Sequence, residues 1–130
     1  MIRKSIDCDQ APPAIGAYSQ GVWAGPFLFL SGLCGVDPKT GAIETSSGVG
    51  EETRLAMEIA EKLLASEGLS FDNVVNARIY ITDMKEFQAM NEVYKSFFTP
   101  PYPARATVEV SKLAGNANVE IVLVAYSDNK

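Results

Sequence analysis

The chain contains no histidine and only two cysteines, and these absences limit the chemistry available to it. Its 130 residues include no His, and the two cysteines are Cys8 and Cys34. Serine or cysteine catalysis assisted by a histidine base is therefore excluded. The two thiols also provide too few nitrogen and sulfur ligands for a zinc site, so we expect no metal. Two cysteines without a motif spacing are more often reduced, buried thiols, although the sequence leaves a Cys8–Cys34 disulfide open.

Positive charge and long apolar runs are also scarce. The chain has 11 Lys and Arg against 16 Asp and Glu, which gives a net charge of -5. Nucleic-acid binding needs a basic surface for the phosphates, so this balance argues against a nucleic-acid partner, short of a local basic cleft. No apolar run approaches the ~20 residues of a membrane span, and residues 1–7 lead into no apolar signal-peptide core. We therefore expect a soluble, cytosolic protein with no membrane association.

The remaining composition is typical of a folded domain. Hydrophobic residues make up 47% and charged residues 21% of the chain, and a chain of 130 residues can bury a substantial core. We expect one domain that spans residues 1–130.

Apolar periodicity predicts six strands and two helices. The expected strands cover residues 2–6, 18–24, 27–33, 74–81, 103–110 and 119–126. The first helix is expected over residues 49–67, with Ser47 as a candidate cap and Gly68 as its C-terminal stop. The second helix is expected to begin at Asp83 and to carry an apolar stripe as far as Phe97. Residues 37–41, Asp-Pro-Lys-Thr-Gly, indicate a turn between strand and helix.

This order of elements favours an α+β fold in which both helices cover one face of a mixed six-stranded sheet. Residues 27–30 are apolar on both faces, so we expect this strand to be covered on both sides. In the fourth strand, one face is expected to carry Val75, Ala77, Ile79 and Ile81. With no third helix to cover the second face of the sheet, we expect another copy of the chain to do so.

Two strands carry an ionisable residue that suggests chemistry. In the first, Arg105 belongs to a period-2 pattern that alternates apolar with polar or charged residues. In the second, Glu120 is a lone carboxylate on a strand that is otherwise apolar on both faces. A buried carboxylate costs several kcal/mol unless it is paired or protonated. One interpretation is an ordinary surface cation and a carboxylate at a wet strand end. The functional one is that Arg105 binds an anion bidentately while Glu120 handles a proton or water.

Asn91 falls on the apolar stripe of the second helix, between Phe87 and Tyr94. An asparagine that faces the core needs hydrogen-bond partners. It either bonds the backbone of a nearby loop or helps to shape a pocket, and the pattern leaves both open.

The chain resembles the RidA/YjgF family of enamine/imine deaminases, also described as L-PSP endoribonucleases. The similar stretches are residues 14–21, Ser31-Gly32, residues 37–41, Phe97-Phe98, residues 103–110 and residues 119–121. The resemblance spans nearly the whole length. Its most specific part is the Pro-Ala-Arg strand followed at this spacing by the Val-Glu-Ile strand.

The resemblance implies a chorismate-mutase-like fold assembled as a homotrimer, in which the sheets form a central barrel and the sites lie in clefts between subunits. The implied activity is that of a 2-iminobutanoate/2-iminopropanoate deaminase. Such enzymes hydrolyse reactive enamines and imines, such as 2-aminoacrylate and 2-iminopropionate, to 2-keto acids and ammonia, and they need no cofactor. Family members occur in the cytosol and in mitochondria.

The resemblance also implies roles for individual residues. Arg105 would hold the substrate carboxylate and Glu120 would position or activate water, while Tyr18, Ser31, Asn91 and Thr107 would line the same pocket. Thr107 stands where many deaminating members carry cysteine, but hydrolysis by water requires no thiol there. Ala114 and Val122 replace a common proline and a frequent second glutamate, which bears on loop shape and polarity.

The spacing of the last two strands adds a geometric expectation. If they are joined as a symmetric antiparallel pair near Ala114, Arg105 lies opposite about residue 124. Glu120 is then ~13 Å away along the strand, at ~3.4 Å per residue. We therefore expect Arg105 and Glu120 of one site to meet across a subunit interface or through an irregular loop.

Two other functions remain compatible with the residues. One is a non-catalytic, small-carboxylate-binding or regulatory protein that uses the same Arg105 pocket. The other is the RNA cleavage or translational inhibition suggested by the older family name. The negative net charge and the missing histidine both argue against this function.

Overall fold

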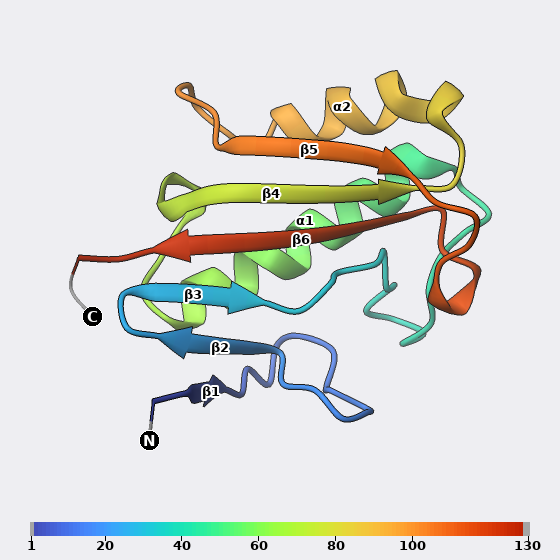
Figure 1. Cartoon of the computed structure of the whole chain (residues 1–130). Helices are drawn as coiled ribbons and strands as arrows, with labels where there is room; N and C mark the ends of the chain where they lie inside the picture. The colour runs from blue at the N-terminus through green and yellow to red at the C-terminus, as the bar shows by residue number, and fades with distance from the viewer. Residues whose placement is uncertain (1, 129–130) are drawn as a thin grey trace.

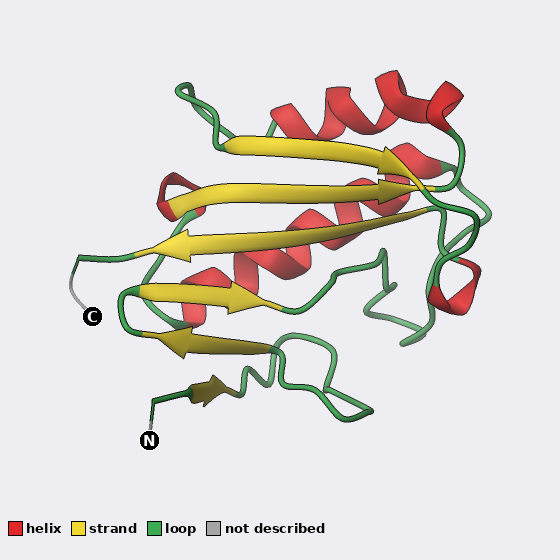
Figure 2. Ribbon diagram, in the orientation of Figure 1, coloured by secondary structure: helices red, strands yellow, loops and turns green. Residues whose placement is uncertain are grey.

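The computed structural model describes residues 2–128, which form a mixed six-stranded sheet with two α-helices on one face (Figures 1 and 2). The strands are β1 (Lys4–Ile6), β2 (Gly21–Ala24), β3 (Phe27–Leu30), β4 (Val74–Ile81), β5 (Ala104–Glu109) and β6 (Val119–Tyr126). The helices are α1 (Val49–Ser66) and α2 (Phe87–Lys95), with single 3₁₀ turns η1 (Phe71–Asn73), η2 (Met84–Glu86) and η3 (Ala114–Asn116). The predicted α+β class, with six strands and two helices on one face, is confirmed.

The strands lie in the order β1-β2-β3-β6-β4-β5. β5 pairs in parallel with β4, and the other neighbouring strands are antiparallel. The direct antiparallel β5–β6 pair that was assumed for the distance from Arg105 to Glu120 is absent, because β4 lies between these strands. A parallel pair needs a crossover connection, which α2 provides between β4 and β5. This topology leaves β5 as an edge strand.

The core lies between the sheet and the helices, which lie behind the strands in Figure 1. The fully buried sheet residues include Leu28, Ile79, Ile81, Val119, Ile121 and Leu123, and those of the helices include Met57, Leu63, Leu64 and Met90. Each fully buried Leu, Ile, Val or Met contributes roughly 1.5–3 kcal/mol. In β6 every second residue is buried, as the sequence predicts.

The first helix begins at Val49 and stops before Gly68, as predicted, but its N-terminal cap differs from the prediction. Its N-cap is Gly48, with no side-chain cap bond, so the prediction that Ser47 caps the helix is wrong. At the other end Gly68 adopts φ +76°. The Gly68 N–H donates to the Ala65 carbonyl at 3.0 Å, and the Leu69 N–H donates to the Leu64 carbonyl at 2.9 Å. These are the two bonds of a Schellman motif, which favours glycine because of its positive φ.

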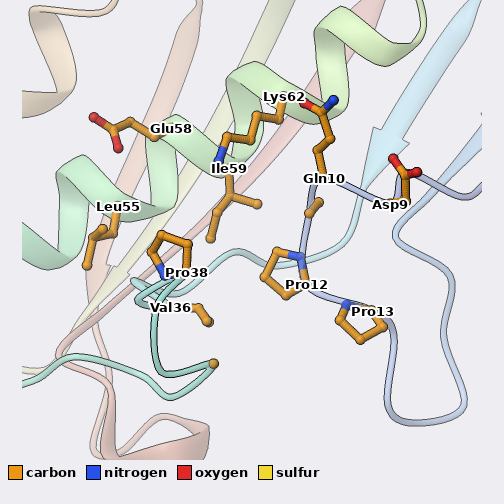
Figure 3. A pocket seen from close by; sticks show the side chains of 12 residues that line it. Asp9, Gln10, Pro12, Pro13, Val36, Pro38, Leu55, Glu58, Ile59 and Lys62 are labelled. Carbon is orange, nitrogen blue, oxygen red and sulfur yellow. The ribbon is translucent and has the colours of Figure 1, made fainter.

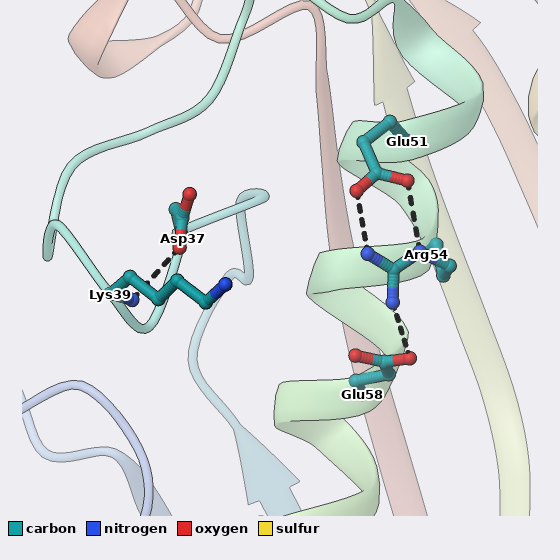
Figure 4. Close-up of polar contacts among 5 residues, drawn as sticks. All are labelled: Asp37, Lys39, Glu51, Arg54 and Glu58. Carbon is teal, nitrogen blue, oxygen red and sulfur yellow. Dashed lines mark hydrogen bonds and ion pairs between the residues drawn. The ribbon is translucent and has the colours of Figure 1, made fainter.

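Local polar contacts fix the turns around the helices. Asp83 accepts from the Lys85 N–H at 3.0 Å and begins the η2 turn, which leads into α2. Asp37 accepts from the Lys39 N–H at 2.8 Å, which confirms the turn predicted over residues 37–41 (Figure 4). On the outer side of α1, Arg54 pairs with both Glu51 and Glu58, one turn before and one turn after it (Figure 4). These pairs brace a solvent-exposed helix face.

Three strand predictions need correction. β2 begins at Gly21 rather than at residue 18, and β3 ends at Leu30 rather than at residue 33. Phe29 is 47% exposed, so a single copy covers one side of β3, and cover of its other side by a second copy stays a prediction. Val75 is 44% exposed, because a bulge between Val74 and Asn76 shifts the alternation and buries Val74 instead.

The sheet face opposite the helices is apolar and open. Its exposed large side chains are Phe27, Phe29, Val108 and Tyr126, and the strand registers place them on the face that carries Glu120. The edge of the Phe27 ring packs against Tyr126, at 5.2 Å between ring centroids. Within residues 2–128, no helix has the length and apolarity needed to cross a membrane.

Candidate functional site

Arg105 lies on β5, on the helix side of the sheet. It is the register neighbour of buried Ala77, and its guanidinium reaches α2. There its Nη1 donates to Asn91 Oδ1 at 2.6 Å. The guanidinium carbon also lies 4.9 Å from the ring centroid of Tyr94 and 5.5 Å from that of Phe87. Asn91 thus bonds a charged side chain rather than loop backbone, and it orients an exposed cation that two aromatic rings support.

Two residues with hydroxyls belong to the same region: the Tyr94 ring lies under the Arg105 guanidinium, and Thr107 lies on the same face of β5 as Arg105, two residues along the strand. Tyr94 Oη and Thr107 Oγ1 are buried and have no hydrogen-bond partner within residues 2–128. Burial raises the pKa of Tyr94 to about 12, although the Arg105 cation acts in the opposite direction. Tyr94 therefore keeps its proton at neutral pH. Arg105, Asn91, Thr107 and Tyr94 together form what we call the Arg105 cluster, a group with one oriented cation and two hydroxyls.

Glu120 lies on β6, on the open face of the sheet and beside a segment that follows β3. Leu33 of that segment bridges to Ile121, with N–H to carbonyl distances of 2.8 and 2.9 Å. Cys34 donates its thiol to Glu120 Oε1 at 3.6 Å. Both cysteines are free thiols, so the Cys8–Cys34 disulfide that the sequence left possible is not formed.

Tyr18 lies in the loop just before β2, and Ser31 directly follows β3. Ser31 Oγ donates to the Ser19 carbonyl at 2.6 Å, which ties the start of the Gly32 segment to the loop that carries Tyr18. The Tyr18 side chain is 52% exposed. We call Glu120 and Cys34, whose side chains are in contact, the carboxylate cluster.

The two clusters do not meet within one chain. Along β4, Arg105 lies beside Ala77 and Glu120 lies beside Tyr80, and these two β4 residues point to opposite faces of the sheet. Three residues along β4 and two strand spacings separate Arg105 and Glu120 by roughly 14 Å between backbones. Arg105 and Glu120 are thus far apart in one chain, as predicted. Their separation arises because β4 lies between β5 and β6, and not from an offset along a directly paired β5 and β6.

A cleft of about 280 Å³ lies elsewhere, between α1, the loop at residues 9–13 and the loop at residues 36–41 (Figure 3). Proline rings, Leu55 and Ile59 form its apolar walls, and Lys62 and Glu58 lie at its border. None of the predicted site residues lines it. Within residues 2–128, no group of three or more His, Cys, Asp and Glu side chains is placed to hold a metal ion.

Sequence reasoning missed Tyr94 and Cys34 as members of the two clusters, and it missed Phe87 as a ring that supports Arg105. Phe87 and Tyr94 lie on the same helical stripe as Asn91, so their pattern indicated core packing rather than support for Arg105. Cys34 carried no local signal, because its contact with Glu120 depends on the long-range bridge between Leu33 and Ile121.

Comparison with known proteins gives consistent matches over almost the whole chain. A family model described as "Endoribonuclease L-PSP" matches residues 8–127. The human protein named 2-iminobutanoate/2-iminopropanoate deaminase is 38% identical over 125 residues, which cover 96% of this chain and 90% of the human one.

Solved structures agree with these matches. The crystal structure of E. coli TdcF with bound serine matches with a TM-score of 0.88 and 37% identity, over 96% of this chain and 99% of that one. RidA from an Antarctic Psychrobacter matches with a TM-score of 0.89 and 34% identity, over 95% of this chain and 99% of that one.

Proposed function

The chain belongs to the RidA/YjgF family, and from this membership we propose that it hydrolyses 2-imino and 2-enamino acids to 2-keto acids and ammonia. The substrate class is small imino acids such as 2-iminopropionate. The observation that carries the proposal is the exposed Arg105 guanidinium, oriented by Asn91 and by two aromatic rings.

Arg105 anchors the substrate carboxylate in this proposal. A guanidinium stays charged at any working pH and matches a carboxylate with two parallel hydrogen bonds. The bond from Nη1 to Asn91 and the rings of Tyr94 and Phe87 hold the planar group in place before substrate arrives. Such preorganisation reduces the entropy lost on binding. Thr107 and Tyr94 offer hydroxyls to the bound acid.

Glu120 acts on water. Its carboxylate takes a proton from water as the water oxygen attacks the imine carbon, the electron pair of the C=N bond moves to nitrogen, and Glu120 passes the same proton to that nitrogen. In the resulting tetrahedral adduct Glu120 accepts the hydroxyl proton as the keto C=O forms and passes it to the amino nitrogen, which leaves as ammonia when the C–N bond breaks. The products are a 2-keto acid and ammonia, and no redox partner is required.

The complete site requires two copies of the chain. Within one copy the Arg105 cluster and the carboxylate cluster lie on opposite sheet faces, so one copy cannot place both on the same small molecule. The apolar open face around Phe29 and Val108 supports assembly of one RidA-like domain per copy into a homotrimer with a central barrel. Arg105, on the edge strand β5, then faces Glu120 of a neighbouring copy.

The direct test measures 2-keto acid release from 2-iminopropionate generated in situ. We expect rapid release by the wild type and a loss of at least ~100-fold in kcat/KM for Arg105→Ala, since a bidentate charged contact contributes roughly 3 kcal/mol or more. Arg54→Ala removes another arginine on the outer side of α1 and should retain full activity. Equal activity of Arg105→Ala and Arg54→Ala would contradict the proposal.

A carboxylate-binding protein without catalysis is the second candidate, favoured by the serine bound in the TdcF structure. In that case calorimetry would detect 2-keto acid binding that depends on Arg105, while the wild type would not accelerate hydrolysis of any imino acid tested.

A further inference from the structure

The Glu120 carboxylate lies in a slot formed by two alternate residues of the segment after β3. Cys34 Sγ is 3.6 Å from Oε1, and Gly32 lies beside Oε2. A Cβ atom added at Gly32 would come within 2.5 Å of Oε2, well inside van der Waals contact. The bridge between Leu33 and Ile121 fixes the segment in register with β6. A side chain at position 32 would therefore displace the Glu120 carboxylate from the position in which it contacts Cys34.

The Cys34 thiol keeps its proton in this environment. Burial raises the pKa of Cys34 to about 12, and the carboxylates of Glu120 and Glu52 act in the same direction. At neutral pH the sulfur is thus an S–H donor, and Glu120 is the acceptor. A thiol this poorly ionised is a weak nucleophile, so a covalent role for Cys34 is disfavoured.

We propose that Cys34 is a positioning residue that holds the Glu120 carboxylate in its slot, so that the second oxygen is aimed at the attacking water. This inference rests on the proposed hydrolysis of imino acids. It assigns no chemical step to sulfur, since every proton transfer involves Glu120. It explains why a protonated, half-buried thiol lies against the one carboxylate that the reaction uses.

A kinetic comparison of two substitutions tests the positioning role. Cys34→Ala removes the donor, and kcat should fall about fivefold with KM unchanged, because Arg105 still anchors the acid. Cys34→Ser retains a donor. Its shorter side chain and shorter hydrogen bond require Glu120 to move by about 1 Å, and it should recover part of the lost kcat. A purely structural loss would not be rescued in this way.

Thiol alkylation tests the contact without any reference to activity. In a Cys8→Ser background, Cys34 is the only thiol. The folded chain should react with iodoacetamide at least about 30 times more slowly than the same chain unfolded in urea. A raised pKa makes the folded thiolate rarer and each thiolate more nucleophilic, and the first effect is the larger one. Adding Glu120→Gln removes the neighbouring charge and should accelerate alkylation at least about threefold. Glu61→Gln, on the exposed side of α1, serves as the matched control and should leave the rate unchanged.

The outcomes separate this inference from the proposed function. Unchanged kcat in Cys34→Ala, or an alkylation rate indifferent to Glu120→Gln, overturns the positioning role even if the wild type is an active deaminase. A wild type without deaminase activity in which Glu120→Gln still accelerates alkylation overturns the proposed function and with it the positioning role of Cys34 in that reaction, and only the contact between the two side chains is then supported.

Discussion

Replacement of Glu52 by alanine should strongly destabilise the fold. Glu52 lies on α1 and is 0% exposed. Its carboxylate accepts from the Asn118 backbone N–H at 2.8 Å and from Asn118 Nδ2 at 2.6 Å. Asn118 directly precedes β6, two residues before Glu120. The contact therefore fixes the start of the central strand to the helix behind it.

The expected magnitude follows from those two bonds. Glu52→Ala leaves two donors of Asn118 unpaired, at about 1–3 kcal/mol each, and opens a small cavity. Because Asn118 is half-buried, water compensates part of this loss. We expect the free energy of unfolding to fall by about 3 kcal/mol, which corresponds to roughly 10 °C in Tm for a chain of this size. Glu52→Gln keeps one acceptor but turns an amide N–H₂ toward the second donor, so its loss should be about half as large.

Urea unfolding followed by tryptophan fluorescence measures this effect. Trp23 is the single tryptophan of the chain and is 4% exposed, so its emission reports on unfolding of the core. Glu61→Ala removes an exposed glutamate from the same helix and should change stability by less than about 0.5 kcal/mol. All variants are compared at one protein concentration, since assembly contributes to apparent stability. A Glu52→Ala variant within ~1 kcal/mol of Glu61→Ala would refute the reasoning.

Two further predictions concern stability. Gly68→Ala should lower the free energy of unfolding by about 1 kcal/mol, because Gly68 has a positive φ. Gly50→Ala should instead stabilise α1 by about 0.5 kcal/mol, because its added Cβ would lie 3.7 Å from Val93 Cγ2, an ordinary contact distance. Equal shifts of the urea midpoint in the two variants would contradict this prediction. The raised pKa of Cys34, from an ordinary 9.0 to about 12, means that above pH 9 the unfolded chain binds fewer protons than the folded one, so stability is lost as pH rises. The urea midpoint of the wild type should therefore fall more steeply between pH 8.5 and 10 than that of Cys34→Ala, and parallel profiles would exclude the effect.

Local patterns predicted those parts of the fold that depend on local chemistry. The alternation in β6, the helix over residues 49–66 and its stop at Gly68 follow from side-chain periodicity and backbone preference. Ser47 shows the limit of such signals, because its side chain had the right chemistry for a cap, but the helix begins one residue later, after Gly48.

Long-range pairing could not be predicted in the same way. The insertion of β4 between β5 and β6 depends on contacts between strands far apart in sequence, and chain order alone favoured a direct β5–β6 pair. For the same reason the spacing of Arg105 and Glu120 indicated that they are far apart in one chain, but it did not indicate opposite faces of the sheet. The thiol of Cys34 beside Glu120 also depends on such a pairing and left no trace in the local sequence.

The central claim is that each active site combines Arg105 of one copy with Glu120 of another. We would test it by co-expressing Arg105→Ala and Glu120→Gln chains in equal amounts and measuring 2-keto acid release. Each variant alone should be nearly inactive. In random mixed assemblies about one quarter of the interfaces join an intact Arg105 to an intact Glu120, so we expect about one quarter of wild-type activity. A mixed assembly no more active than its separate parent variants would contradict the account, since it would place both residues of each site in one chain.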